Sequence, residues 1–207
     1  MSEPLTALFD TLARVRILRL FLFNPSQEVS MADILRRAKL SQRAARTELT
    51  QLERADIIRR KFIFEIIPGK AKRRKVLGYS LNKNSPVVAP LQKFLFDTTP
   101  INGATLQKHL RGVGKIQVLV VAGVFLREFE RRIDVLIAVE KLNAAKIETA
   151  IRNLEAELGV GIKYAAFSTA DLLYRIGMHD KLTRDVFDFS HELLVDKVNA
   201  REEARAR

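Results

Sequence analysis

Apolar side chains recur at helical spacing near the start of the chain. After Pro4, the apolar positions are Leu5, Leu8, Leu12, Val15, Leu18 and Leu22. Separations of three and four residues place side chains on one face of a helix. The dipeptide Asn24-Pro25 that follows is a turn signal. The pattern therefore predicts one amphipathic helix over residues 5–22 that ends before this turn.

Two further helices are predicted between residues 30 and 55. Ser30, with Asp33 three residues later, has the pattern of an N-terminal cap, and Ser41 is a second N-cap candidate. In the helix after Ser41 the apolar positions, which define one buried stripe, are Ala45, Leu49 and Leu52. The polar positions at its start or on its opposite side are Gln42, Arg43, Arg46, Thr47 and Thr50.

A β-hairpin is predicted after the third helix. The segment "DIIRRKFIFEII" is rich in β-branched and aromatic residues, and "VLGYSLN" returns the chain. The linking segment "PGKAKRRK" contains a Pro-Gly turn signal, so the two runs are expected to pair as antiparallel strands. The cations of this turn are Lys70, Lys72, Arg73, Arg74 and Lys75.

This order of helices and hairpin resembles the winged helix-turn-helix of the arsenic-repressor and antibiotic-resistance-repressor families. The residues that carry the resemblance are "ARVRILRLFLF", "SMADILRRAKLSQRAARTELTQLERADII" and "GYSLN". It covers residues 1–85 and implies a transcriptional regulator that binds double-stranded DNA. In such a protein the third helix enters the major groove, where arginine can bridge O6 and N7 of guanine.

The resemblance assigns roles to the polar residues of this region. Arg43 and Arg46 become the leading base-contact candidates, with Gln42, Thr47 and Thr50 beside them. Ser41 is expected to cap the helix, whose first amides could meet a phosphate. The turn cations are expected to contact phosphates and to supply affinity more than sequence choice. The alternatives are that the two arginines are exposed helix formers and that the turn is a solvated loop.

The distribution of charge agrees with a polyanion partner. The net charge is +12, and residues 1–98 hold 19 Lys and Arg against 9 Asp and Glu. Residues 99–207 hold 17 against 15, so the basic excess belongs to the first half. A basic excess concentrated in one module is the electrostatic footprint of nucleic-acid binding.

Residues 86–103 are predicted to link two domains and to include a helix. "SPVVAPLQKFLFDTT" carries apolar residues at near-helical spacing, and all six prolines of the chain fall at or before Pro100. In winged-helix regulators a helix after the wing often pairs two protomers, so a homodimer is expected. The alternative is that this helix packs only on its own domain.

Residues 104–199 are predicted to form a small α/β domain, which makes the chain a two-domain α+β protein with a tail over residues 200–207. "KIQVLVVAGVF", "RIDVLIAV" and "GIKYAAFS" have the composition of buried strands. Helices are predicted over "ATLQKHLRG", over "AAKIETAIRNLEAELG" after the N-cap Asn143, and over "STADLLYRIG", where Ser168 and Asp171 form a cap. Strands alternating with helices are typical of this class.

The second half resembles a minimal nucleotidyltransferase domain of the polymerase-β type. That family has a Gly-Ser after a strand, then Asp-x-Asp opening the next strand, and a third carboxylate on a later strand. In "AGVFLREFERRIDVLIAV", Gly123 and Asp134 match, whereas Val124 replaces the serine and Arg132 replaces the first aspartate. The later strand holds Lys163 and no acid. Two-metal phosphoryl transfer needs several carboxylates, so we expect no catalysis, no metal and no cofactor.

The remaining residues of this region suggest two roles for the second domain. Asp134 is expected to be structural and paired with Arg131 or Arg132. A cleft for an anionic effector such as a nucleotide would be formed by Gly123, Arg127, Arg131, Arg132 and Asp134, since arginine recognises phosphate well. Alternatively, the domain serves for dimerisation or for docking a partner.

Composition narrows the other function classes. The absence of cysteine excludes disulfides and thiolate catalysis, and three scattered histidines argue against a histidine metal site. No apolar run reaches the roughly 18 residues that span a bilayer, and the first residues lack the pattern of a secretion signal. We therefore expect a cytoplasmic protein. The competing hypotheses are a divergent nucleotidyltransferase acting on nucleic acid or nucleotides, and a winged helix that binds RNA or protein.

Overall fold

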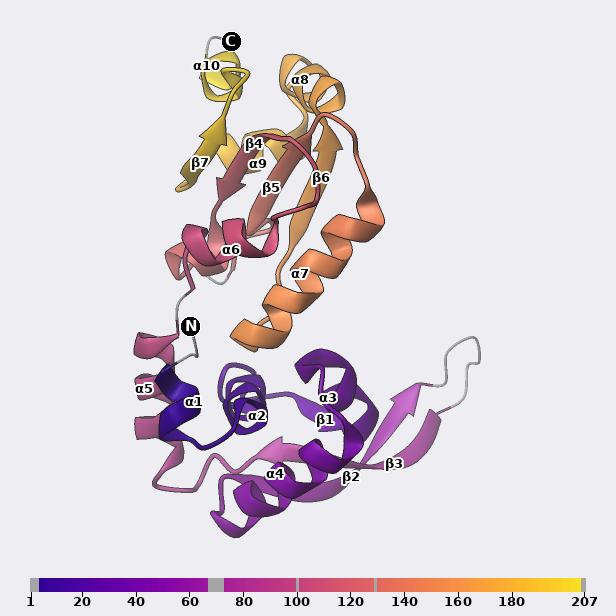
Figure 1. The fold of residues 1–207 in the computed structure, drawn as a ribbon, viewed down its shortest axis with the longest axis vertical. Coiled ribbons are helices and arrows are strands. Elements are labelled where there is room, and N and C mark those ends of the chain that lie inside the picture. Colours follow the sequence, from indigo (N-terminus) through magenta and orange to yellow (C-terminus); the bar gives the residue numbers. More distant parts are fainter. Residues whose placement is uncertain (1–3, 67–72, 100, 129, 206–207) are drawn as a thin grey trace. The chain divides into compact units, whose positions relative to one another are not determined.

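The computed structural model describes residues 4–66, 73–99, 101–128 and 130–205. It is mixed α and β (Figure 1), which confirms the predicted α+β class. The chain divides into two compact units, one formed by residues 1–99 with 155–160 and the other by residues 100–154 with 161–207. Within the described ranges, none of the helices has the length and apolarity needed to cross a lipid bilayer.

The first unit combines helices with a small antiparallel sheet. Its helices are α1 (Pro4–Leu8), α2 (Leu12–Leu22), α3 (Met31–Ala38), α4 (Gln42–Arg54) and α5 (Val88–Thr98). Its strands are β1 (Glu28–Ser30), β2 (Ile58–Ile66) and β3 (Arg73–Leu81), in the order β1-β3-β2. The predicted hairpin is confirmed, because β2 and β3 pair antiparallel from Ile58 with Leu81 to Ile66 with Arg73. The short strand β1, which sequence analysis missed, pairs with the base of β3.

The predicted single helix over residues 5–22 is wrong, because the chain breaks between α1 and α2. Asp10 adopts a positive φ of 69°, a conformation that ends a helix and that aspartate tolerates better than most residues. Thr11 then caps α2, and its hydroxyl oxygen accepts a hydrogen bond from the Arg14 amide. The side chains on either side of the break, Leu8 and Leu12, are 64% and 40% exposed.

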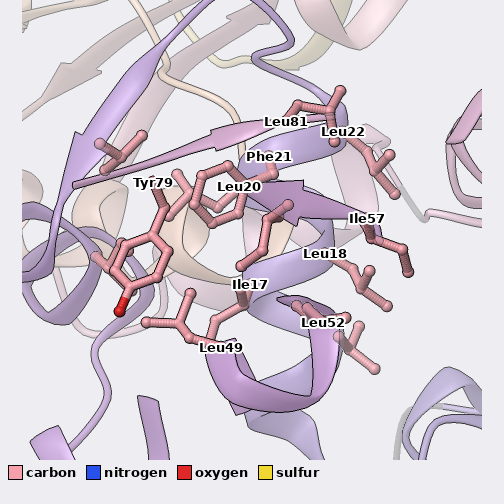
Figure 2. Close-up of a cluster of buried hydrophobic side chains, with 14 of the residues drawn as sticks. Ile17, Leu18, Leu20, Phe21, Leu22, Leu49, Leu52, Ile57, Tyr79 and Leu81 are labelled. Atoms are coloured by element: carbon pink, nitrogen blue, oxygen red, sulfur yellow. The ribbon is translucent and has the colours of Figure 1, made fainter. Parts of the chain in front are cut away.

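The core of the first unit is built around α2 (Figure 2). Its apolar side chains between Ile17 and Leu22 meet Leu49 and Leu52 of α4 and Tyr79 of β3, all of them buried. Burial of each large apolar side chain contributes about 1.5–3 kcal/mol. The core therefore fixes the orientation of α4 relative to α2 and to the hairpin.

The second unit is a mixed sheet with helices. Its helices are α6 (Gly103–His109), the 3₁₀ helix η1 (Gly123–Leu126), α7 (Ala144–Leu158), α8 (Thr169–Gly177), α9 (Lys181–Phe187) and α10 (Ala200–Arg205), although the end of α7 from residue 155 onward belongs to the first unit. Its strands are β4 (Ile116–Val121), β5 (Val135–Val139), β6 (Tyr164–Ser168) and β7 (Glu192–Asp196), in the order β6-β5-β4-β7. Strand β4 is antiparallel to β5 and β7, whereas β5 and β6 are parallel.

Several local predictions for this unit are confirmed, and others need correction. The side chains of Asn143 and Ser168 accept hydrogen bonds from amides in the first turns of α7 and α8, as caps do. The strand predicted over residues 115–125 ends at Val121, because the chain turns into η1 at Gly123, where φ is +51°. Strand β7 and helix α9 had not been predicted.

Candidate nucleic-acid interface

Helix α4 is held by a cap at its start and by one buried stripe along its length. The hydroxyl oxygen of Ser41 accepts a hydrogen bond of 3.3 Å from the Ala44 amide, which confirms the predicted N-cap. The predicted stripe of Ala45, Leu49 and Leu52 is confirmed, since these side chains are 0%, 1% and 4% exposed. The sides of α4 that face away from the core are therefore fixed as well.

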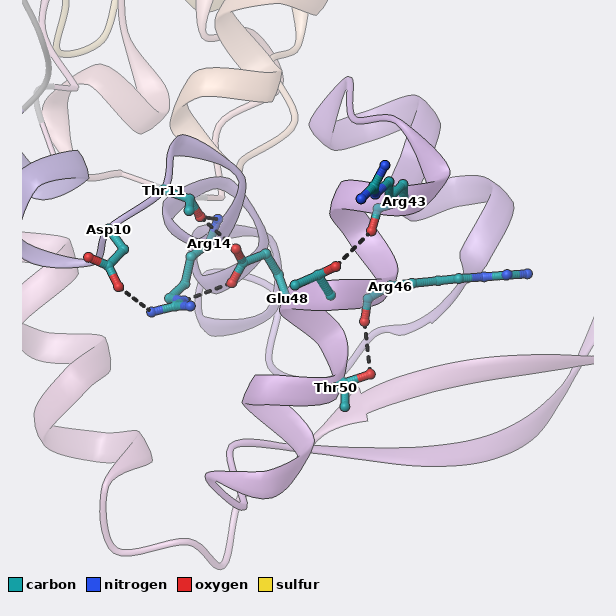
Figure 3. Close-up of polar contacts among 8 residues, drawn as sticks. Asp10, Thr11, Arg14, Arg43, Arg46, Glu48 and Thr50 are labelled. Carbon is teal, nitrogen blue, oxygen red and sulfur yellow. Dashed lines mark hydrogen bonds and ion pairs between the residues drawn. The ribbon is translucent and has the colours of Figure 1, made fainter.

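The five polar residues predicted for the outer side of α4 are all exposed, and so is Ser41. The residues of this surface, called here the α4 outer face, are Gln42, Arg43, Arg46, Thr47 and Thr50. Figure 3 shows the Arg46 side chain extending away from the helix on the side opposite to Glu48. The Thr47 and Thr50 hydroxyls donate to the carbonyl oxygens of Arg43 and Arg46, at 3.1 and 2.9 Å.

The two arginines of the α4 outer face keep their guanidinium groups available. Among the described residues, neither Arg43 nor Arg46 forms an ion pair. The threonine hydroxyls, whose protons are directed to the helix backbone, still present acceptor lone pairs and methyl groups outward. This face thus offers planar cationic donors next to small amphipathic groups, the chemistry that reads base edges or phosphates.

Glu48 anchors α4 on the side opposite to its outer face, and sequence analysis missed it. Its side chain accepts hydrogen bonds from the Thr11 hydroxyl at 2.8 Å and from Nε of Arg14 at 2.7 Å (Figure 3). Glu48 is 4% exposed, and Arg14 also pairs with Asp10 at 3.6 Å. One feature of the sequence could have revealed its burial: Glu48 lies three positions after Ala45 and next to Leu49, so it adjoins the apolar stripe of the helix.

The hairpin places its described cations in solvent. Arg73, Arg74 and Lys75 are exposed at the start of β3, whereas Lys70 and Lys72 lie outside the described residues. Arg74 pairs with Glu65 at 3.2 Å across the hairpin. Nζ of Lys75 lies 4.5 Å from the centroid of the Phe62 ring. In Figure 1 the hairpin extends past helix α3 at the right of the view.

In the second unit, Gly123 and Asp134 lie next to each other, and both carboxylate oxygens of Asp134 accept hydrogen bonds from the backbone. Its carboxylate is 1% exposed. One oxygen accepts from the Val124 amide at 2.9 Å, and the other accepts from the Lys163 amide at 2.7 Å. A Cβ atom added at Gly123 would lie 1.9 Å from Oδ1 of Asp134. This carboxylate therefore joins η1, β5 and the segment before β6, and it fills the space beside Gly123.

The expected pairing of Asp134 with Arg131 or Arg132 is wrong, because its oxygens are taken by backbone amides. Nε of Arg131 pairs instead with Glu128 at 2.6 Å, and its guanidinium stacks on the Phe189 ring. This hydrogen bond lowers the pKa of the Glu128 carboxyl below its ordinary value. Arg132 pairs with Asp185 at 3.5 Å.

Among the predicted cleft residues, Arg127 and Arg132 are exposed and Arg131 is half-buried. Arg127 ends η1 with a positive φ of 64°. Among the described residues, no group of three or more His, Cys, Asp or Glu side chains lies close enough to hold a metal ion. An anion at this place would have to compete with Glu128 for Arg131 and with Asp185 for Arg132.

A surface hollow of about 360 Å³ lies elsewhere in the second unit. It is formed by the end of α6, the residues that follow it and the first turns of α7, and it includes Arg111 and Lys146. None of the described residues that line it is acidic. Sequence analysis missed this hollow because its cations come from two separate segments.

No family model matches the chain, and neither does any curated protein or solved structure. Its function is therefore inferred from the residues of its own surface.

Replacing Glu48 by alanine is expected to destabilise the first unit by about 2–3 kcal/mol, because the Thr11 hydroxyl and Nε of the half-buried Arg14 both lose the carboxylate that accepts from them. Urea unfolding, followed by far-ultraviolet circular dichroism, measures the effect. The matched control is Glu53→Ala on the same helix, where the pair with Arg60 has side chains 33% and 49% exposed. That change should cost less than about 1 kcal/mol. Equal losses for the two variants would show that Glu48 does not anchor α4.

Replacing Gly123 by alanine is expected to lower the free energy of unfolding by about 3 kcal/mol. The new methyl group would clash with the Asp134 carboxylate, and alanine would also be strained by the positive φ. The control is Gly112→Ala, because Gly112 has a φ of +89° but open space around it. Backbone strain alone should make that control cost about 1 kcal/mol. Thermal unfolding of both variants tests the difference, and similar losses would contradict the close contact with Asp134.

Proposed function

We propose that the chain is a sequence-specific transcriptional regulator that binds double-stranded DNA in the cytoplasm. In this proposal the first unit is a winged helix-turn-helix, in which α3 and α4 form the helix-turn-helix and β2 with β3 forms the wing. The order of helices and the antiparallel hairpin support this assignment. The connection from α3 to α4 is short, with Lys39 in the left-handed conformation at the end of α3.

The observation that carries the proposal is the α4 outer face. A helix fits the major groove of B-form DNA, where its exposed side chains reach base edges. Here the buried stripe and Glu48 fix one side of α4. The other side carries a glutamine, two threonines and two arginines that form no ion pair with any residue the structure describes. Arg43 and Arg46 are proposed to contact bases, and Gln42, Thr47 and Thr50 to contact bases or adjacent phosphates.

The wing is proposed to contribute affinity through phosphate contacts. Arg73, Arg74 and Lys75 are exposed cations on a hairpin that extends past α3 (Figure 1). Phosphate contacts carry no base information, but they position a protein on the duplex and make its binding salt-dependent. The concentration of positive charge in residues 1–98 supports the same role.

A homodimer is proposed, and an exposed apolar surface supports it. Leu8, Leu12, Val87 and Phe94 of the first unit are 64%, 40%, 49% and 39% exposed. The ring of Phe94 on α5 meets Phe9 after α1, with centroids 6.4 Å apart. Exposed apolar groups on adjoining elements favour contact with a partner. A dimer would place two copies of α4 on successive turns of the duplex, which raises specificity.

The second unit is proposed to be a nucleotidyltransferase-like domain that performs no catalysis and serves ligand sensing or dimerisation. The contacts of Asp134 support this, because both of its oxygens accept backbone hydrogen bonds that a metal ligand would have to break. If the unit senses an anionic effector, the hollow with Arg111 and Lys146 is better provided with free cations than the predicted cleft at Gly123. Within the described part of the chain, neither of these two cations forms an ion pair.

Changing Arg43 to alanine is expected to reduce discrimination at one base pair by about 1–3 kcal/mol, because a bidentate contact to guanine is lost.

Changing Arg73, Arg74 and Lys75 together to glutamine should weaken binding to every duplex alike. It should also lower the slope of log affinity against log salt by up to about 0.9 for each lost phosphate contact. Fluorescence anisotropy over a panel of duplexes with single base-pair changes measures both effects.

The control for this experiment is Arg152→Ala in the second unit, where the arginine is 63% exposed and pairs with Glu148. Its duplex affinity should equal that of the wild type. If neither set of changes alters duplex binding, the proposed function is wrong. Tighter binding of structured RNA than of any duplex would favour the RNA alternative instead.

Replacing Leu8 by aspartate is expected to shift a dimer toward the monomer without unfolding it, because this side chain is already 64% exposed in the single chain. Light scattering after gel filtration, across a range of concentrations, measures the mass. The matched control is Leu142→Asp, at a leucine of the second unit that is 46% exposed. A wild-type protein that is monomeric at all concentrations, or an unchanged mass for Leu8→Asp, would contradict this dimer surface.

A further inference from the structure

Two phenylalanines on the hairpin are unusually exposed for aromatic side chains. Phe62 and Phe64 on β2 are 63% and 68% exposed, and Leu77, which pairs with Phe62 on β3, is 39% exposed. Single exposed apolar residues are common on protein surfaces, but a contiguous exposed group marks an interaction site. We call the surface formed by Phe62, Phe64, Leu77 and Lys75 the aromatic face.

The aromatic face continues the core side of the sheet. Side chains alternate along a strand, so Ile58, Arg60, Phe62 and Phe64 of β2 share one side with their partners on β3. At the base of the hairpin this side is buried, since Ile58, Tyr79 and Leu81 belong to the core. Farther along, Phe62 and Phe64 lie beyond the core. The aromatic face therefore lies on the side of the hairpin that packs against the helices of the first unit.

The charges of the hairpin are divided between its two sides. Lys75 pairs with Phe64 and places its ammonium over the Phe62 ring, and Arg73 shares this side by register. Glu65 is the single carboxylate in the segments 58–66 and 73–81, and it lies on the opposite side, paired with Arg74. The aromatic face thus combines exposed rings with cations and, within the described strands, bears no acidic residue.

We propose that the aromatic face binds unpaired bases of nucleic acid, as in single-stranded or locally opened DNA. The rings of Phe62 and Phe64 stack on bases, while Lys75 and Arg73 neutralise the neighbouring phosphates. Aromatic rings combined with a cationic track are how proteins bind single strands without sequence preference. This inference rests on the proposed function, because it assigns a second nucleic-acid surface to the same unit.

Charge favours a nucleic acid over a second copy of the chain as the occupant. In a symmetric dimer through this face, the same patch would meet itself, which would bring Lys75 and Arg73 of both copies together without a carboxylate on either side. The unpaired bases of a single strand complement the exposed phenylalanine rings, and the phosphates on either side of each base complement Lys75 and Arg73. Same-side residues of a strand lie about 6.6–6.8 Å apart, and Phe62 and Phe64 are both exposed, with Lys75 over the ring of Phe62.

The test compares the wild type with the double variant Phe62→Leu/Phe64→Leu, which keeps apolar side chains but removes both rings. The probes are a thymidine oligonucleotide, an abasic oligonucleotide of equal length, and an intact duplex. We expect the wild type to bind the thymidine strand more tightly than the abasic one. The double variant should lose roughly 10- to 100-fold in affinity for the thymidine strand, with no change toward the abasic strand or the duplex.

Two further variants make the result specific. The chain contains no tryptophan, so Phe64→Trp introduces a single tryptophan, and the fluorescence of this tryptophan should be quenched by the thymidine strand and not by the abasic one. The matched control is Tyr174→Leu on α8, an aromatic side chain of the second unit that is 66% exposed. Its affinity for all three probes should equal that of the wild type.

The proposal is overturned if the double variant binds the thymidine strand as the wild type does, or if the wild type does not distinguish thymidine from abasic strands. A lower molecular mass of the double variant with unchanged strand affinity would instead assign the face to contact between copies, and would also overturn it. Failure of the proposed function has a different signature, namely no retention of the intact duplex by the wild type. In that case the thymidine measurements still decide the role of the aromatic face.

Discussion

The packing of α4 against α2 determines which residues of the first unit are presented to a partner. Ala45, Leu49 and Leu52 place one side of α4 in the core, where it packs against the apolar side chains of α2. Glu48 adds a directional contact, because its two oxygens accept from Thr11 and Arg14 at the start of α2. Together the apolar stripe and this buried carboxylate fix the rotation of α4 about its own axis. Arg43 and Arg46 point outward as a consequence.

The two units use buried carboxylates in a similar way. Glu48 joins α4 to α2, and Asp134 joins β5 to η1 and to the segment before β6 through backbone amides. In each case a satisfied acidic side chain positions secondary structure. Asp134 has a structural role, because both of its carboxylate oxygens accept hydrogen bonds from backbone amides. Most of the cations among the described residues are exposed, in contrast, and Arg43 and Arg46 are two that form no ion pair there.

The sequence predicted features that depend on strong local patterns. The stripe of α4, the caps at Ser41, Asn143 and Ser168 and the β2–β3 hairpin follow from periodicity and turn chemistry over a few neighbouring residues. The break at Asp10 was missed because the apolar spacing continues across it, although Leu8 and Leu12 turned out to be exposed. The left-handed conformation of Asp10 ends α1, and the cap at Thr11 begins α2, so the helix is interrupted although the apolar spacing is regular.

Other features could not be predicted because they depend on contacts between distant segments. Strand β1 has three residues, too few for a period, and it exists because it pairs with β3. Arg19 reads as one cation among many, yet it is fully buried and its Nε donates to Thr99, eighty positions away. The expected partner of Asp134 was a neighbouring arginine, whereas its partners are amides that the fold brings close. At the candidate interface the sequence predicted which α4 residues are exposed, but it did not predict Glu48 or the exposure of Phe62 and Phe64.

We propose that the outward side of α4 reads the sequence of double-stranded DNA. Selection of bound duplexes from a random pool tests it most directly, because the method assumes no target. We expect the recovered duplexes to share a motif whose two halves are related by symmetry and lie about 10–10.5 base pairs apart, or a multiple of that spacing. A recovered pool with no shared motif, at salt concentrations where binding persists, would contradict it.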